Sequence, residues 1–183
     1  MVRGMPLDAT RNSLVLPILG LLLEQPAHAY QVTARLETRY PHLRIRRSSV
    51  VTLLKSLADG GLLLPGTPER VANRPARTSY RPTDAGIELF RARVREALTD
   101  TAPASADFLT AVAYLGILPA AEAIAVLRAR VERLRRETPV IPPGLPEIQM
   151  IEVHYWLRVL ATEITWLTET ADRLADGELE VLV

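Results

Sequence analysis

Apolar residues recur at helical spacing in three short segments near the start of the chain, at about residues 13–24, 28–39 and 48–59. Ser13 and Ser48 stand at the start of the first and third segments, and both are residue types that commonly cap a helix N-terminus. Three short helices, each with one apolar face, predict a compact unit of helix-turn-helix type. The buried stripe expected in the third helix consists of Val50, Leu53, Leu54 and Leu57.

A wing is predicted directly after the third helix. Gly60 and Gly61 supply the left-handed conformation that ends a helix. Residues 62–66 and 78–82 then read as two short strands, and the segment between them is basic and punctuated by prolines. Thr83 is the expected cap of a fourth helix, whose apolar positions are Ile87, Phe90, Val94 and Leu98.

The second half of the chain reads as all-helical after a polar linker at 99–105. Helices are expected at about 106–115, 120–137 and 147–175. In the last of these, apolar residues alternate in steps of four and three over three repeats, which is a heptad seam. We see no partner of matching length in the chain and therefore expect two copies to pair through this helix. The expected dimer interface consists of Val153, Leu157, Leu160, Ile164, Leu167 and Leu174.

These elements predict a mostly α protein, with an N-terminal winged helix-turn-helix that carries a small two-stranded wing. The predicted division is a winged-helix domain at 1–98, a linker at 99–105 and an all-helical C-terminal domain at 106–183.

Charge separates the two halves. Residues 1–95 hold 15 Lys/Arg and 7 Asp/Glu, whereas residues 96–183 hold 7 Lys/Arg and 14 Asp/Glu, although the whole chain has a formal net charge of only +1. Such asymmetry favours an anionic partner for the first half.

Cysteine is absent, which excludes disulfides, thiolate catalysis and Cys-ligated zinc. The apolar run at 14–23 resembles a secretory signal but fits a buried helix better, and ten residues are too few to cross a bilayer. We therefore expect a cytoplasmic protein without a membrane partner.

Signatures of catalysis are missing from the sequence. The nine glycines form no phosphate-binding loop, and the three histidines have no carboxylate or second histidine at ligand spacing. No nucleophile elbow surrounds any serine. The expectation is a protein that is not an enzyme and has no metal site and no cofactor.

Nucleic-acid binding has stronger support. Arg44, Arg46 and Arg47 precede the third helix, whose N-terminal end would enter a DNA major groove first. Phosphates bind helix N-termini, and nearby arginines add charge-assisted bonds. The alternative is a basic loop that is merely solvated. The rest of the expected DNA-binding set comprises Ser48, Thr52, Lys55 and Ser56 on the polar helix face, and Arg70, Arg74 and Arg77 in the wing.

Three stretches carry a family resemblance: "ILGLLLEQPAHAYQVTARL", "IRRSSVVTLLKSLADGGLL" and "RTSYRPTDAGIELF". Through them, residues 14–90 resemble the winged-helix domain of the PadR family of transcriptional regulators. Residues 107–137 resemble the C-terminal region of the longer members. The resemblance implies a homodimeric repressor whose C-terminal helices dimerise and often sense a small molecule.

The resemblance also implies individual DNA contacts. It assigns a phosphate contact to Tyr30 and an early recognition-helix contact to Ser49. The family's usual tyrosine is replaced by Val51, its proline by Thr52 and its glycine before the tyrosine by Ala29. Either the arginines compensate for these changes or the preferred DNA sequence differs.

Aromatic residues of the C-terminal half allow two interpretations. They could line an effector pocket, or they could pack the core and the dimer interface. The candidates are Phe108, Tyr114, Tyr155, Trp156 and Trp166.

The predicted function is a dimeric, sequence-specific regulator of transcription that binds operator DNA and acts as a ligand-responsive repressor. The alternatives are a winged-helix protein-interaction module and a protein that sequesters a small molecule without operator binding.

Overall fold

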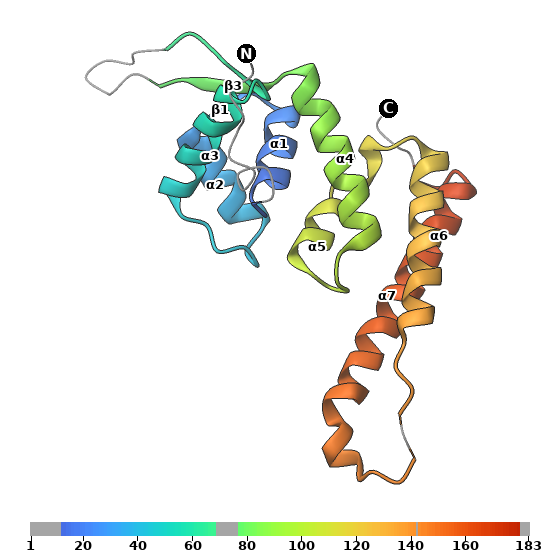
Figure 1. Ribbon diagram of the computed structural model, residues 1–183. Helices are drawn as coiled ribbons and strands as arrows, with labels where there is room; N and C mark the ends of the chain where they lie inside the picture. Colours follow the sequence, from blue (N-terminus) through green and yellow to red (C-terminus); the bar gives the residue numbers. More distant parts are fainter. Residues whose placement is uncertain (1–11, 69–76, 142, 180–183) are drawn as a thin grey trace. The chain divides into compact units, whose positions relative to one another are not determined.

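The computed structural model describes residues 12–68, 77–141 and 143–179, and the chain forms two units, Met1–Arg93 and Val94–Val183 (Figure 1). The predicted fold class is confirmed: a winged helix-turn-helix is followed by an all-helical part. The division between the units falls within helix α4 (Asp84–Asp100), which extends into the stretch that we predicted to be a linker.

Three helices form the core of the first unit: α1 (Val15–Glu24), α2 (Ala29–Arg39) and α3 (Arg47–Asp59). α1 is buried on nearly all sides because it is almost entirely apolar. α2 and α3 each bury a single stripe, as the sequence predicted. The buried apolar residues of these two helices are Val32, Leu36, Val50, Leu53, Leu54 and Leu57.

Both serine caps were predicted wrongly. α1 begins at Val15, and the side chain of Asn12 rather than Ser13 accepts a hydrogen bond, from the Leu14 N–H at 2.9 Å. α3 begins at Arg47, so that Ser48 already lies inside the first turn and caps nothing. In both cases the chain enters the helix at a different residue from the one that the apolar stripe suggested.

The wing belongs to a three-stranded antiparallel sheet rather than a two-stranded one. The strands are β1 (Ala27–His28), β2 (Leu63–Pro65) and β3 (Ser79–Pro82), in the order β1-β3-β2. β1 joins the sheet by pairing Ala27 with Tyr80. Two residues carry no alternation of apolar and polar positions, so the sequence pattern gave no sign of β1.

The end of α3 is fastened to the start of α4. Of the two glycines, only Gly61 adopts a left-handed conformation, with φ +76°. The Thr83 hydroxyl donates to the Gly61 carbonyl at 2.8 Å and accepts from the Gly86 N–H at 3.1 Å, which confirms Thr83 as the cap of α4. Gly86 lies so close to Leu62 that a Cβ placed on it would stand 2.1 Å from the Leu62 carbonyl oxygen.

The described part of the second unit contains the end of α4, three further α-helices and two 3₁₀ turns. Helix α5 (Ala106–Val112) ends three residues before the predicted end, and the turn η1 (Leu115–Ile117) follows it. Helix α6 (Ala120–Glu137) has the predicted bounds. The last predicted helix opens as the turn η2 (Glu147–Met150) and continues as α7 (Ile151–Ala175).

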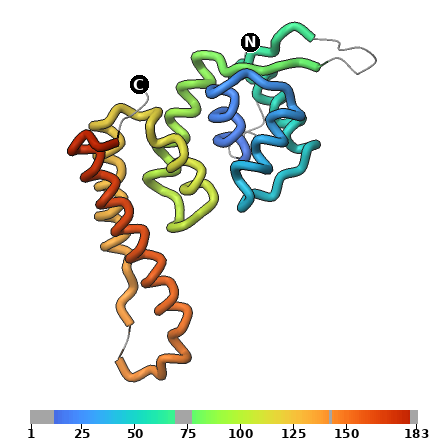
Figure 2. The backbone as a smooth tube through the Cα atoms, turned by 180° about the vertical axis from the view of Figure 1, so that it is seen from behind, coloured from blue at the N-terminus to red at the C-terminus, as the bar shows by residue number. Residues whose placement is uncertain are grey.

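α6 and α7 run side by side in opposite directions, and the first part of α7 extends beyond the end of α6 (Figure 2). α6 is thus an intramolecular partner for the later part of the seam, where the sequence analysis had seen none. Leu160, Leu167 and Leu174 are buried within one chain. The other three seam residues, Val153, Leu157 and Ile164, are half-buried.

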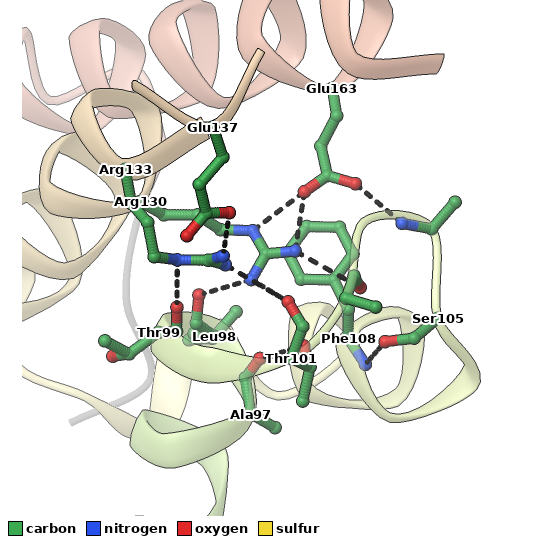
Figure 3. Close-up of polar contacts among 12 residues, drawn as sticks. Ala97, Leu98, Thr99, Thr101, Ser105, Phe108, Arg130, Arg133, Glu137 and Glu163 are labelled. Atoms are coloured by element: carbon green, nitrogen blue, oxygen red, sulfur yellow. Dashed lines mark hydrogen bonds and ion pairs between the residues drawn. The ribbon is translucent and has the colours of Figure 1, made fainter. Parts of the chain in front are cut away.

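A buried ion pair joins α6 to α7 (Figure 3). The Arg130 side chain is completely buried, and its guanidinium lies 2.7 Å from the Glu163 carboxylate. It also lies 4.1 Å from the centre of the Phe108 ring. Burial lowers the pKa of Arg130 from its ordinary value, while the hydrogen bond and the charge of Glu163 oppose that shift.

Two arginines of α6 hold the carbonyl groups at the end of α4. Arg130 donates to the carbonyls of Leu98 and Thr101, each at 3.1 Å. Arg133 donates to the carbonyls of Thr99, at 3.0 Å, and Thr101, at 3.1 Å. The last carbonyls of a helix have no partner within it, so these guanidiniums cap α4 from a distant part of the sequence.

Candidate nucleic-acid interface

The start of α3 is open to an external anion. Arg46 is the N-cap residue, and its side chain makes no capping hydrogen bond. The first turn contains no acidic residue. The free N–H groups of this turn and the positive end of the helix dipole therefore face no carboxylate of the helix itself. Arg44, Arg46 and Arg47 are all exposed around this helix end.

Tyr30 and Arg47 form one cluster, although they belong to different helices. Tyr30 lies in the first turn of α2 and is 60% exposed. The Arg47 guanidinium carbon lies 5.5 Å from the centre of the Tyr30 ring. A cation over an aromatic face is held in place by the ring quadrupole. The structure thus brings a phenol and a guanidinium together beside the start of α3.

The outward face of α3 carries short polar side chains and one lysine. Ser48, Thr52 and Lys55 are exposed. Val51, which replaces the tyrosine expected from the family resemblance, is half-buried on the same helix. The remaining candidates of this helix, Ser49 and Ser56, are also half-buried.

The described cations of α2, α3 and the wing, together with those of the loop before α3, fall into two kinds. Arg35 and Arg39 both form ion pairs with Glu24 and so connect α2 to α1. A second set makes no ion pair with any other described residue and is available to an external anion. These cations are Arg44, Arg46, Arg47, Lys55, Arg77 and Arg81.

The wing is described only in part. Arg70 and Arg74 lie outside the described residues, and Arg77 is half-buried just before β3. The sequence analysis missed Arg81, an exposed cation within β3 that stands opposite Leu64 of β2. The basic stretch predicted between the two strands does not include Arg81, and the alternation of side chains between the two faces of a strand is the signal that could have identified this cation.

The candidate effector residues do not form one group. Phe108 and Trp166 line the same cavity of the second unit. Tyr114 is buried, whereas Tyr155 and Trp156 are exposed and do not belong to that cavity lining.

Within residues 12–68, 77–141 and 143–179, no cluster of side chains suits a metal ion. The helices in this part of the chain are all too short or too polar to cross a membrane.

Comparison with known proteins gives a family match. Residues 18–92 match the family described as "Transcriptional regulator PadR-like family". Among solved structures, Bacillus subtilis PadR in complex with operator DNA is 18% identical, with a TM-score of 0.45, over 89% of this chain and 99% of the other. The same protein in complex with p-coumaric acid is 17% identical, with a TM-score of 0.39, over 90% and 99%.

A PadR family transcriptional regulator from Eggerthella lenta is 28% identical, with a TM-score of 0.40, over 47% of this chain and 72% of the other. A search of curated proteins gave no match.

Proposed function

We propose that the protein is a homodimeric, ligand-responsive repressor of the PadR-like family that binds specific operator DNA, because residues 18–92 match that family of transcriptional regulators. The family consists of transcriptional regulators and not of enzymes. In this proposal residues 1–98 bind DNA, and residues 106–183 hold two copies together and sense a small molecule.

The observation that carries the proposal is the group of unpaired arginines at the uncapped start of α3. Arg44, Arg46 and Arg47 surround N–H groups that no side chain of the helix satisfies. A DNA phosphate supplies the missing acceptor, and the guanidiniums add charge-assisted bonds to it. Since Arg47 also lies against the Tyr30 ring, its guanidinium is held close to a second phosphate ligand.

Phosphate contacts position a protein on DNA, whereas contacts to base edges specify the sequence. We assign the first role to Tyr30, Arg46 and Arg47. The second role falls to Thr52 and Lys55, which are exposed further along α3, together with Ser49. The unpaired cations of the wing, Arg77 and Arg81, extend the phosphate set, as do Arg70 and Arg74 in the same proposal.

The two sets should respond differently to mutation. Arg46→Ala and Arg47→Ala are expected to weaken binding to every duplex and to lower the slope of log K against log salt by about one per lost contact. Thr52→Ala and Lys55→Ala should cost about 1–3 kcal/mol on the operator and little on scrambled DNA. The measurement is affinity for the DNA upstream of the protein's own gene, and for a scrambled duplex, across a salt series.

Arg35→Ala is the matched control, because this arginine of the same unit is engaged with Glu24. It should leave the salt slope unchanged. If Arg46→Ala and Arg47→Ala bind like the wild type, the arginines are only a solvated edge and the proposal is wrong. Equal losses on both duplexes for all variants would show that α3 does not read sequence.

Val51 favours a second candidate, a winged helix that docks a protein instead of DNA. A half-buried apolar residue stands where the resemblance expects a polar aromatic contact. This candidate predicts no preference for operator over scrambled DNA at any salt concentration. The same titrations therefore separate the two functions.

A further inference from the structure

A cavity of about 500 Å³ lies between α5 and α7 in the second unit. This is within the range of cavities that hold small molecules, roughly 300–1,000 Å³. Its walls are mainly apolar, and parts of them are open to water: Leu109 is 46% exposed and Trp166 is 39% exposed. The other apolar lining residues are Ala104, Phe108, Val112 and Val159.

Glu163 is the one acidic residue of the lining, and its carboxylate is already engaged. One oxygen accepts from the Arg130 Nε–H at 2.8 Å (Figure 3). The other oxygen accepts from the Ala104 N–H at 2.7 Å. Ala104 adopts a left-handed conformation with φ +53°, which a residue with a Cβ seldom does, and the hydrogen bond to Glu163 holds it there. A cationic ligand would have to compete with Arg130 for this carboxylate.

Arg158 is the cation of the lining, and unlike the Glu163 carboxylate its guanidinium is not engaged in an ion pair with any other described residue. The Arg158 side chain is exposed. A guanidinium at the edge of an apolar cavity selects ligands that carry an anionic group, because the charge-assisted bond adds to the burial of apolar surface.

We propose that this cavity binds an apolar small molecule that carries one carboxylate, with Arg158 as its counter-ion. The role of that molecule as an effector rests on the regulatory function proposed above, whereas its binding does not.

The cavity wall is continuous with the residues that cap α4. Glu163 and Phe108 line the cavity, and both contact Arg130, which holds the Leu98 and Thr101 carbonyls. A ligand that packs against Phe108 therefore restrains the same side chains that fix the end of α4. Since α4 begins in the winged-helix unit, this contact provides a route by which occupancy affects DNA binding.

Ligand binding can be followed by fluorescence, since the protein has only two tryptophans and Trp166 alone lines the cavity. The Trp156→Phe variant leaves Trp166 as the sole reporter. Octanoate should change its emission saturably, and octylamine should bind at least about tenfold more weakly, which corresponds to about 1.4 kcal/mol. Octanamide, which has the same length and no charge, should fall between the two.

Arg158→Gln should remove the preference for octanoate over octylamine, and Arg158→Lys should keep part of it. Arg173→Gln is the matched control, because Arg173 lies on the same helix but pairs with Glu178 outside the cavity lining. It should bind octanoate like the wild type. The proposal is overturned if octanoate gives no saturable signal, which is the result expected when a second copy of the chain fills the cavity. It is also overturned if octylamine binds as tightly as octanoate.

The regulatory role has its own readout. Saturating octanoate should slow amide hydrogen exchange in residues 98–104 and shift the affinity for operator DNA at least about threefold. If octanoate saturates Trp166 and both quantities stay unchanged, the effector role is wrong, while DNA binding itself is judged by the ligand-free titrations. A third outcome separates the two proposals. If the protein binds no operator, yet prefers octanoate and loses this preference in Arg158→Gln, the proposed repressor function is wrong and the proposed ligand site is supported.

Discussion

Glu163 and Arg130 lie in the interior of the C-terminal unit as a charged pair that satisfies several backbone groups. Burying two charges is costly, and their attraction offsets that cost only when the remaining hydrogen-bonding capacity is also used. Here the guanidinium reaches two carbonyls at the end of α4, and the carboxylate reaches the Ala104 N–H. The pair therefore determines how three segments meet: the end of α4, the turn before α5, and the α6–α7 pair.

Glu163→Gln should lower the free energy of unfolding by about 3–5 kcal/mol. The variant leaves the buried guanidinium without a counter-charge. It also turns one acceptor oxygen into an N–H₂ donor that faces either Arg130 or the Ala104 N–H, both of which are donors. Urea unfolding monitored by circular dichroism measures the change.

Glu178→Gln is the comparison, because it removes the same charge from the exposed pair with Arg173. Solvent-exposed pairs contribute about 0–1 kcal/mol, so this variant should unfold close to the wild type. Similar losses for both variants would show that burial of the Arg130–Glu163 pair has no special importance.

Among the elements, the junction between α3 and α4 brings two backbone segments of the winged-helix unit close together. Leu62 follows the glycine stop of α3, and Gly86 lies in the first turn of α4. Because both partners in this contact are backbone, neither can move aside as a flexible side chain would.

Gly86→Ala should lower the free energy of unfolding by about 1–3 kcal/mol, because the new Cβ would meet the Leu62 carbonyl oxygen at 2.1 Å. Helix propensity alone predicts the opposite sign, a gain of about 0.5–1 kcal/mol. The midpoint of urea unfolding distinguishes the two expectations: it should fall in Gly86→Ala if the steric clash dominates and rise if helix propensity dominates. Ala92→Gly, at an exposed position of α4, reports the ordinary propensity difference in the same helix.

Apolar periodicity predicted the helices well, since burial of one face is what stabilises them. It did not identify their first residues, because capping depends on how the backbone enters the helix: Leu14 is the N-cap of α1, and its N–H donates to the Asn12 side chain where a cap by Ser13 was expected. The buried ion pair was missed although it left a signal. Arg130 stands at helical spacing between Leu127 and Leu134, on the apolar stripe of α6, and a charge in that position calls for a buried partner.

The DNA-binding candidates on α3 could be chosen from the sequence because they occupy the face opposite an apolar stripe. Which arginines form ion pairs could not be predicted, because Glu24, the partner of Arg35 and Arg39, is more than ten residues away from them in the chain. The cavity was also beyond the sequence pattern. It depends on how α5 lies against α7, so that Phe108 and Trp166 line the cavity whereas Tyr155 and Trp156 do not.

For the molecule as a whole, the first part of α7 offers the surface for the proposed dimer. Ile151 and Tyr155 are 54% and 70% exposed in a single chain and lie four residues apart on the part of α7 that extends beyond α6. Exposed apolar side chains at helical spacing favour pairing with another helix. The later seam residues, such as Leu160, are already covered within one chain.

The double variant Ile151→Glu/Tyr155→Glu should be monomeric in sedimentation experiments while its helix content is retained, because neither side chain contributes to the core of one chain. Thr165→Glu, at an exposed position on the same helix, is the control and should stay dimeric. A double variant that still sediments as a dimer would place the interface elsewhere.

The two arginines at the end of α4 bear on the order in which the protein acquires its structure. Domains generally fold as units, with the N-terminal one first during synthesis. Helices α1, α2 and α3 pack on one another and on the sheet within the first unit, but the carbonyl of Leu98 finds its partner Arg130 only 32 residues later in the chain. Glu163 follows a further 33 residues on. On a growing chain the last turn of α4 therefore remains frayed after the winged helix has formed, and it becomes permanent only when α6 and α7 have both been made.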